Sequence, residues 1–87
     1  MRVTGDSMIG DRINAGDILV VDCSVEPTEG RVVVVWYNGE HTVKRIHYAE
    51  PLIVLMPSNE KYEPMYVQPQ DDFRIFGVVM YNICKLV

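Results

Sequence analysis

Residues 31–48 read Arg-Val-Val-Val-Val-Trp-Tyr-Asn-Gly-Glu-His-Thr-Val-Lys-Arg-Ile-His-Tyr, and this stretch decides the fold class. Asn38-Gly39, between two runs of β-branched and aromatic residues, is a strong short-range signal for a hairpin with a type I′ turn. The pattern predicts strands over residues 31–37 and 40–48. A two-residue turn pairs Tyr37 with Glu40, and the same register pairs Val33 with Lys44.

This register places a lysine on an apolar face. Side chains alternate between the two faces of a strand, so Lys44 shares its face with Val33, Val35, Thr42 and Ile46. The opposite face carries His41, Val43, Arg45 and His47. Burial among apolar groups disfavours an ammonium and lowers a lysine pKa below its ordinary value of ~10.4. Lys44 is therefore a candidate general base.

The rest of the chain also reads as strands and turns. Further strands are expected over residues 18–22, 52–56, near 65–67 and over 73–84, while Gly5 to Met8 reads as a turn that opens one helical turn. No convincing amphipathic helix is present. The prediction is an all-β fold of several short antiparallel strands and hairpins, built as a single domain over residues 1–87.

Composition excludes several classes of protein. Hydrophobic residues make up 48% of the chain, which is ample for a core. The formal charge is -4 and the basic residues are scattered apart from Lys44-Arg45, so we expect no direct nucleic-acid binding. No apolar run approaches the ~20 residues of a membrane span. Cys23 and Cys84 fit no metal or redox spacing, and without a secretion signal we expect free thiols, a cytoplasmic protein and no cofactor or metal.

The candidate nucleophile is Ser7, in the segment Gly5-Asp6-Ser7-Met8. A serine hydroxyl attacks well only when a base takes its proton, and a neutral lysine can do so. Taken alone, Gly-Asp-Ser is equally typical of an ordinary turn. The residues by themselves do not show that Ser7 approaches Lys44.

Several linked motifs favour the catalytic interpretation. They are Gly5-Asp6-Ser7-Met8, Ile13-x-x-Gly16-Asp17-x-Leu19-Val20-Val21-Asp22, Gly39-Glu40-x-Thr42-Val43-Lys44-Arg45, Leu55-x-Pro57-x-Asn59-x-x-Tyr62-x-Pro64 and Phe76-Gly77-Val78-Val79. In order and spacing this set resembles the LexA and UmuD family of self-cleaving serine–lysine peptidases, over nearly the whole chain. The resemblance implies Ser7 as nucleophile and Lys44 as general base, with the backbone N–H groups of Ser7 and Met8 as the oxyanion hole.

Within the family the motifs most resemble UmuD. That resemblance implies an SOS-response protein that forms a homodimer through the final strand, around residues 73–83. It implies cleavage of its own N-terminal arm, stimulated by a RecA filament on single-stranded DNA, followed by service as accessory subunit of an error-prone, UmuC-like translesion polymerase. The arm precedes the serine in this family, so we expect it to be missing from these 87 residues. Ala15-Gly16 resembles a cleavage dipeptide but belongs to the Gly-Asp turn.

Other functions remain open. The same domain serves as the cleavage and dimerisation half of LexA-like or phage repressors, which also need a helix-turn-helix. A pure interaction module that binds a polymerase and RecA would keep the catalytic pair without using it. A type I signal peptidase would need a membrane anchor and a later Gly-Asp motif, and neither is found here. Strand alternation further predicts that Tyr62, Met65 and Tyr66 line the substrate groove.

Overall fold

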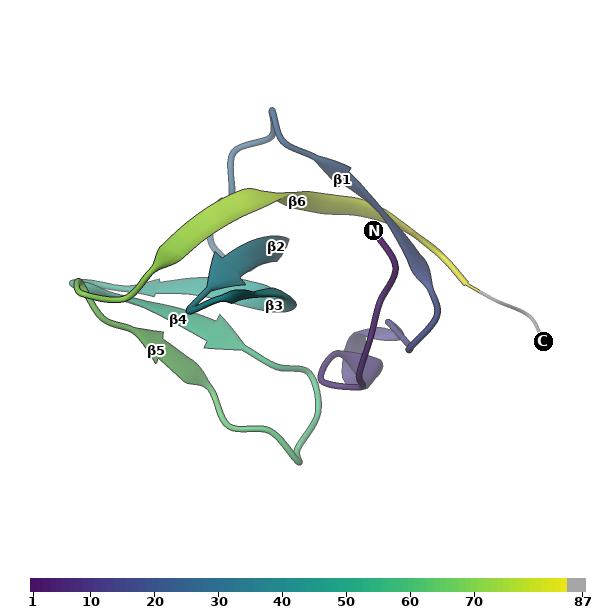
Figure 1. The fold of residues 1–87 in the computed structure, drawn as a ribbon, viewed down its shortest axis with the longest axis horizontal. Coiled ribbons are helices and arrows are strands. Elements are labelled where there is room, and N and C mark those ends of the chain that lie inside the picture. The colour runs from purple at the N-terminus through teal and green to yellow at the C-terminus, as the bar shows by residue number, and fades with distance from the viewer. Residues whose placement is uncertain (85–87) are drawn as a thin grey trace.

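The computed structural model describes residues 1–84, and over this range it is one antiparallel sheet with a single short 3-10 helix (Figure 1). The strands lie in the order β1-β6-β2-β3-β4-β5. Their bounds are β1 Ile18–Asp22, β2 Val32–Tyr37, β3 Glu40–Ala49, β4 Leu52–Met56, β5 Met65–Val67 and β6 Phe73–Ile83, and the helix η1 is Ile9–Asp11. The all-β prediction is confirmed, and each strand bound lies within one residue of its predicted position.

The central hairpin has the predicted register. Tyr37 pairs with Glu40 and Val33 pairs with Lys44 across β2 and β3. The turn residues Asn38 and Gly39 have φ values of 47° and 95°. A type I′ turn requires positive φ at both central positions, and asparagine followed by glycine adopts this backbone at low cost. The turn therefore fixes which residues of β3 face each side of the sheet.

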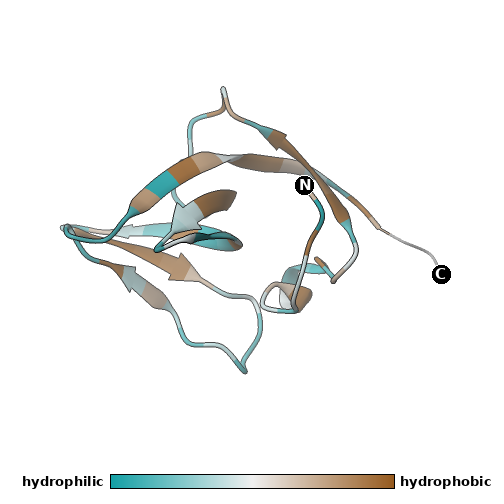
Figure 2. Ribbon diagram, in the orientation of Figure 1, coloured by the Kyte–Doolittle hydropathy of each residue, from teal (hydrophilic) through white to brown (hydrophobic). Residues whose placement is uncertain are grey.

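Alternation along β2 divides the core between the two faces of the sheet. Val33 and Val35 pack on one face with Ile46 and four other apolar residues, Leu55, Val67, Val78 and the half-buried Tyr37. Val34 belongs to the other face, where it packs with Val43 and with Met8 of the N-terminal segment. Hydrophobic stretches run along β1, β2, β4 and much of β6, whereas the connecting loops are mostly hydrophilic (Figure 2).

The N-terminal segment is held against the outer edge of β1. Leu19 N–H donates to Met1 O at 2.7 Å, and the backbone of Arg2 forms an isolated antiparallel β-bridge with Ile18. Val3 N–H donates to Asp17 O at 2.8 Å. This pairing carries the chain from the β1 edge to η1, which lies near the loop that follows β4 (Figure 1), and so positions the residues between them.

Within residues 1–84, no helix is long and apolar enough to cross a membrane. Cys23 and Cys84 are both exposed free thiols, as predicted.

Candidate active site

Lys44 is buried in the middle of β3. Its relative exposure is 4%, and its cross-strand partner Val33 and neighbour Ile46 are fully buried. Burial lowers the pKa of Lys44 below its ordinary value of 10.5, because the charged ammonium loses its hydration. The negative charge of Glu40 acts in the opposite direction and only partly restores the pKa. The apolar-faced lysine predicted from the hairpin register is therefore present.

The Lys44 amine is held by three oxygen atoms. Its Nζ lies 2.8 Å from Ser7 Oγ, 2.7 Å from Thr42 Oγ1 and 3.2 Å from the backbone oxygen of Val43. Thr42 and Lys44 share one face of β3, so the threonine hydroxyl lies directly beside the amine. The structure thus brings Ser7 and Lys44 together. The alternation of β3 places Thr42 and Lys44 on the same face, but the sequence analysis did not predict the hydrogen bond between their side chains.

The segment that carries Ser7 is fixed by the connection between β4 and β5. Ser58 N–H donates to Ser7 O at 2.7 Å, and Gly10 N–H donates to Ser58 O at 2.6 Å. Asn59 Nδ2 donates to the backbone oxygen of Asp6 at 2.8 Å, and the Tyr62 hydroxyl donates to the Asp6 carboxylate. The motif Pro57-x-Asn59-x-x-Tyr62 therefore has a local structural role, which is to hold the residues on both sides of Ser7.

A small cavity of about 210 Å³ opens beside Ser7 and Lys44, and Tyr62, Glu63 and Met65 form its other wall. Two of the three predicted groove residues, Tyr62 and Met65, line it. Tyr66 does not line this cavity, because alternation along β5 directs its side chain, which is 55% exposed, to the opposite face. The proposed oxyanion donors, the backbone N–H groups of Ser7 and Met8, lie on the turn that enters η1.

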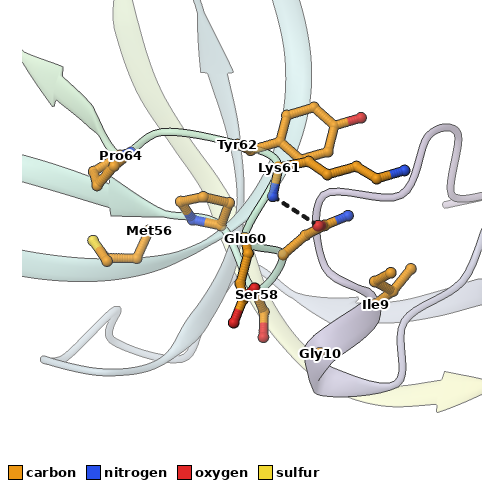
Figure 3. A pocket seen from close by; sticks show the side chains of 10 residues that line it. Ile9, Gly10, Met56, Ser58, Glu60, Lys61, Tyr62 and Pro64 are labelled. Atoms are coloured by element: carbon orange, nitrogen blue, oxygen red, sulfur yellow. Dashed lines mark hydrogen bonds between the residues drawn. The ribbon is translucent and has the colours of Figure 1, made fainter.

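A larger hollow of about 730 Å³ lies along the β4–β5 connection (Figure 3). Ile9 and Gly10 border it on one side, and Met56 and Pro64 border it on the other. Figure 3 also shows the Lys61 N–H donating to Asn59 Oδ1, at 3.0 Å, which fixes the side chain that holds Asp6. Neither member of the Ser7 and Lys44 pair lines this hollow, so the candidate active site is the smaller cavity.

The family model described as Peptidase S24-like matches residues 1–80 of this chain. The chain belongs to the Peptidase S24-like family. The resemblance to the LexA type of self-cleaving serine peptidase is thereby confirmed at the level of the family.

Relatives of this S24-like domain include several proteins named LexA repressor. That of Syntrophotalea carbinolica is 45% identical over 80 residues, which is 92% of this chain and 40% of the relative. LexA repressor 2 of Pseudomonas syringae pv. tomato is 41% identical over 87 residues, 100% of this chain and 41% of the relative. Protein MucA of Salmonella typhimurium is 39% identical over 86 residues, 98% of this chain and 58% of the relative. The chain thus spans about two fifths of these LexA proteins and less than two thirds of MucA.

The two histidines of the S24-like domain lie away from Lys44, as the register predicted. His47 Nδ1 contacts the Glu29 carboxylate at the surface. His41 contacts the rings of Trp36 and Phe76, with centroids 4.9 and 5.3 Å away. Within the described part of the chain, no group of three or more His, Cys, Asp or Glu side chains is arranged to hold a metal ion.

Proposed function

We propose that this domain is a serine endopeptidase that cleaves its own polypeptide, with Ser7 as nucleophile and Lys44 as general base. The observation that supports it is the 2.8 Å contact between Lys44 Nζ and Ser7 Oγ, made by a lysine whose burial lowers its pKa. A serine beside a neutral amine is an activated nucleophile. Residues 1–87 are proposed to form one peptidase domain.

The proposed reaction begins with neutral Lys44. The amine takes the proton of Ser7 as Oγ attacks the peptide carbonyl carbon, and the backbone N–H groups of Ser7 and Met8 stabilise the resulting oxyanion. The Lys44 ammonium then gives its proton to the leaving amine. A water molecule, deprotonated by Lys44, hydrolyses the acyl–Ser7 ester and restores the pair. Thr42 Oγ1, 2.7 Å from Nζ, keeps the amine directed at Ser7 throughout.

The biological setting follows from the relatives and is part of the proposal. Similarity to LexA repressors and to protein MucA supports a cytoplasmic SOS-response role, with self-cleavage stimulated by RecA on single-stranded DNA. If the protein is UmuD-like, the processed form acts as an accessory subunit of an error-prone translesion polymerase. A homodimer is supported by exposed apolar residues in neighbouring cross-strand pairs of β1 and β6, namely Ile18 with Ile83 and Val20 with Tyr81.

A second candidate is the cleavage and dimerisation domain of a LexA-like repressor. The observation that favours it is the 45% identity to the Syntrophotalea carbinolica LexA repressor, of which this chain spans 40%. The two candidates differ in the rest of the gene product. A helix-turn-helix ahead of residue 1 would decide for the repressor, and binding of the processed protein to a translesion polymerase would decide for the accessory role.

The activity is tested on the complete gene product. It is incubated at alkaline pH and, separately, with RecA, ATP and single-stranded DNA, and chain cleavage is followed by mass spectrometry. We expect Ser7→Ala and Lys44→Ala to abolish cleavage. Lys61→Ala, which removes an exposed lysine that does not contact Ser7, is the matched control and should keep it. Absence of cleavage from folded protein under both conditions would overturn the enzymatic proposal and leave a binding module.

A further inference from the structure

Two consecutive residues of β3 contact the segment that carries Ser7. Their side chains leave opposite faces of the strand, because successive strand residues alternate. Lys44 reaches Ser7 Oγ at 2.8 Å from one face, and Arg45 Nη2 lies 3.0 Å from Asp11 Oδ2 on the other. β4 pairs with β3 from Arg45 onward, and residues 7–11 lie beside the chain that follows β4. The segment is therefore held by β3 at both of its ends.

The Arg45 guanidinium joins β3 to two other parts of the fold. Its Nη2 meets the Asp11 carboxylate of η1, and its Nη1 donates to the backbone oxygen of Gly30, just before β2. The Asp11 Oδ2 atom is shielded from solvent and accepts no hydrogen bond of ordinary geometry from residues 1–84. A shielded carboxylate oxygen needs a compensating positive charge, and Arg45 supplies it.

The helix η1 is too short to fix its own position. It has three residues, and a single 3-10 turn has weak hydrogen-bond geometry and little stability in isolation. Ser58 anchors the start of the segment through its N–H to Ser7 O, and Arg45 anchors the end through Asp11. The Asp11 N–H donates to Met8 O at 3.0 Å, so a displacement of Asp11 also displaces Met8. The proposed oxyanion donor on Met8 thus lies between the two anchors.

We propose that Arg45 is a positioning residue for self-cleavage, whose ion pair with Asp11 holds η1 against β3 and aligns Ser7 and the Met8 N–H with Lys44. This inference rests on the proposed function, because it concerns the same reaction. Arg45 does not contact the reacting atoms, since its side chain leaves the face of β3 opposite Lys44. Its charge should also leave the pKa of Lys44 unchanged, because burial and the charge of Glu40 set that pKa.

The test is the pH profile of self-cleavage, measured on the complete gene product. Arg45→Gln and Asp11→Asn each remove one charge of the pair, and both should fold because partly exposed ion pairs contribute little to global stability. We expect the plateau rate to fall about tenfold in each, less than the roughly 10²-fold cost of a 1 Å misplacement, because the Ser58 anchor remains. The pH of half-maximal rate should not change.

Arg31→Gln is the matched control for the lost charge. Arg31 is an exposed arginine that follows Gly30 and contacts Thr28 rather than η1, so this variant should cleave at the wild-type rate.

A double variant assigns the effect to the ion pair. Arg45→Gln combined with Asp11→Asn should lose about tenfold, as each single variant does, whereas independent contributions would multiply to about a hundredfold loss. That hundredfold loss, or a wild-type plateau rate in folded Asp11→Asn, would overturn the inference. A half-maximal rate moved to higher pH in Arg45→Gln would also overturn it, because Arg45 would then act through the charge of Lys44.

Amide hydrogen exchange separates this inference from the proposed function. Exchange is followed by NMR in the complete Ser7→Ala protein, with and without Arg45→Gln. We expect the Asp11 N–H to exchange about tenfold faster without Arg45, whereas the amides of β6 keep their rates. Faster exchange at η1 together with slower self-cleavage supports both proposals. Unchanged exchange in a protein that cleaves overturns the role of Arg45 and leaves the peptidase. Faster exchange in a folded protein that never cleaves overturns the peptidase and leaves Arg45 as the anchor of η1.

Discussion

Gly10→Ala tests whether the β4–β5 connection positions the nucleophile. An added Cβ at Gly10 would overlap Ser58 Oγ and lie 2.5 Å from Ser58 O, whereas ordinary contacts begin at 3.4 Å. The backbone oxygen cannot rotate away, so η1 and Ser58 must separate by about 1 Å. Ser58 also holds Ser7 through its N–H at 2.7 Å. A misplacement of about 1 Å costs roughly 10²-fold in rate, and we expect that loss here.

The assay is the first-order rate constant of self-cleavage of the complete gene product at alkaline pH, measured together with chemical denaturation. Overpacking and the lost Gly10 to Ser58 hydrogen bond should lower the free energy of unfolding by about 2–4 kcal/mol. Val67→Ala is the control, because it removes buried methyl groups on β5 at a similar cost without contacting Ser7. Folded Gly10→Ala that cleaves as fast as the wild type would refute the reasoning.

Four further outcomes are expected. At pH values lower than the Lys44 pKa, the self-cleavage rate should rise tenfold for each increase of one pH unit. The plateau should begin at a pH lower than 10.5, the ordinary lysine pKa, because burial lowers the Lys44 pKa. A rate that does not change with pH would exclude a lysine base. Thr42→Val should lower the plateau rate about tenfold, roughly the free energy of one hydrogen bond, and an unchanged rate would show that Thr42 does not orient the amine. Tyr81→Glu, 69% exposed in the wild type, should halve the mass measured by sedimentation, whereas a wild-type monomer would remove the dimer proposal. Asp17→Ala should cost about 1–3 kcal/mol in urea denaturation, because the Asn14 N–H and the Asn82 amide lose their acceptor; unchanged stability would contradict this.

The fold could be predicted because its strongest signals are local. The Asn38-Gly39 turn sets the hairpin register, and that register alone places Lys44 opposite Val33 on an apolar face. β1 and β4 are short apolar runs bounded by turn residues. These features depend on neighbours within a few residues, so no tertiary information is needed to read them.

The candidate site could not be predicted from local sequence patterns, because contacts between residues far apart in the chain assemble it. Ser58 holds Ser7, and Asn59 holds the preceding residue Asp6; both lie far along the chain and reach this segment only through the tertiary fold. The resemblance to the family predicted that Ser7 and Lys44 lie close together, whereas the local sequence around each residue did not. The β-bulge at Phe76 was missed for the same reason. Its signal lies in the pairing of β2 with β6, and the sequence of β6 alone does not reveal an extra residue.

The burial of Lys44 links stability to the proposed chemistry. Its pKa is lower in the folded chain than in the unfolded chain, so below that lowered value both states are protonated and the folded state bears the cost of a buried charge. As the pH rises through the folded pKa towards 10.5, the unfolded chain holds the extra proton and this contribution to stability recovers. The folded chain is more stable when the Lys44 amine is neutral, and the neutral amine is also the form that can accept the Ser7 proton. Thr42 and Val43 supply oxygen partners that offset part of the cost at lower pH. Lys44 thus makes rate and stability change in the same direction with pH, a coupling that an exposed lysine base would not produce.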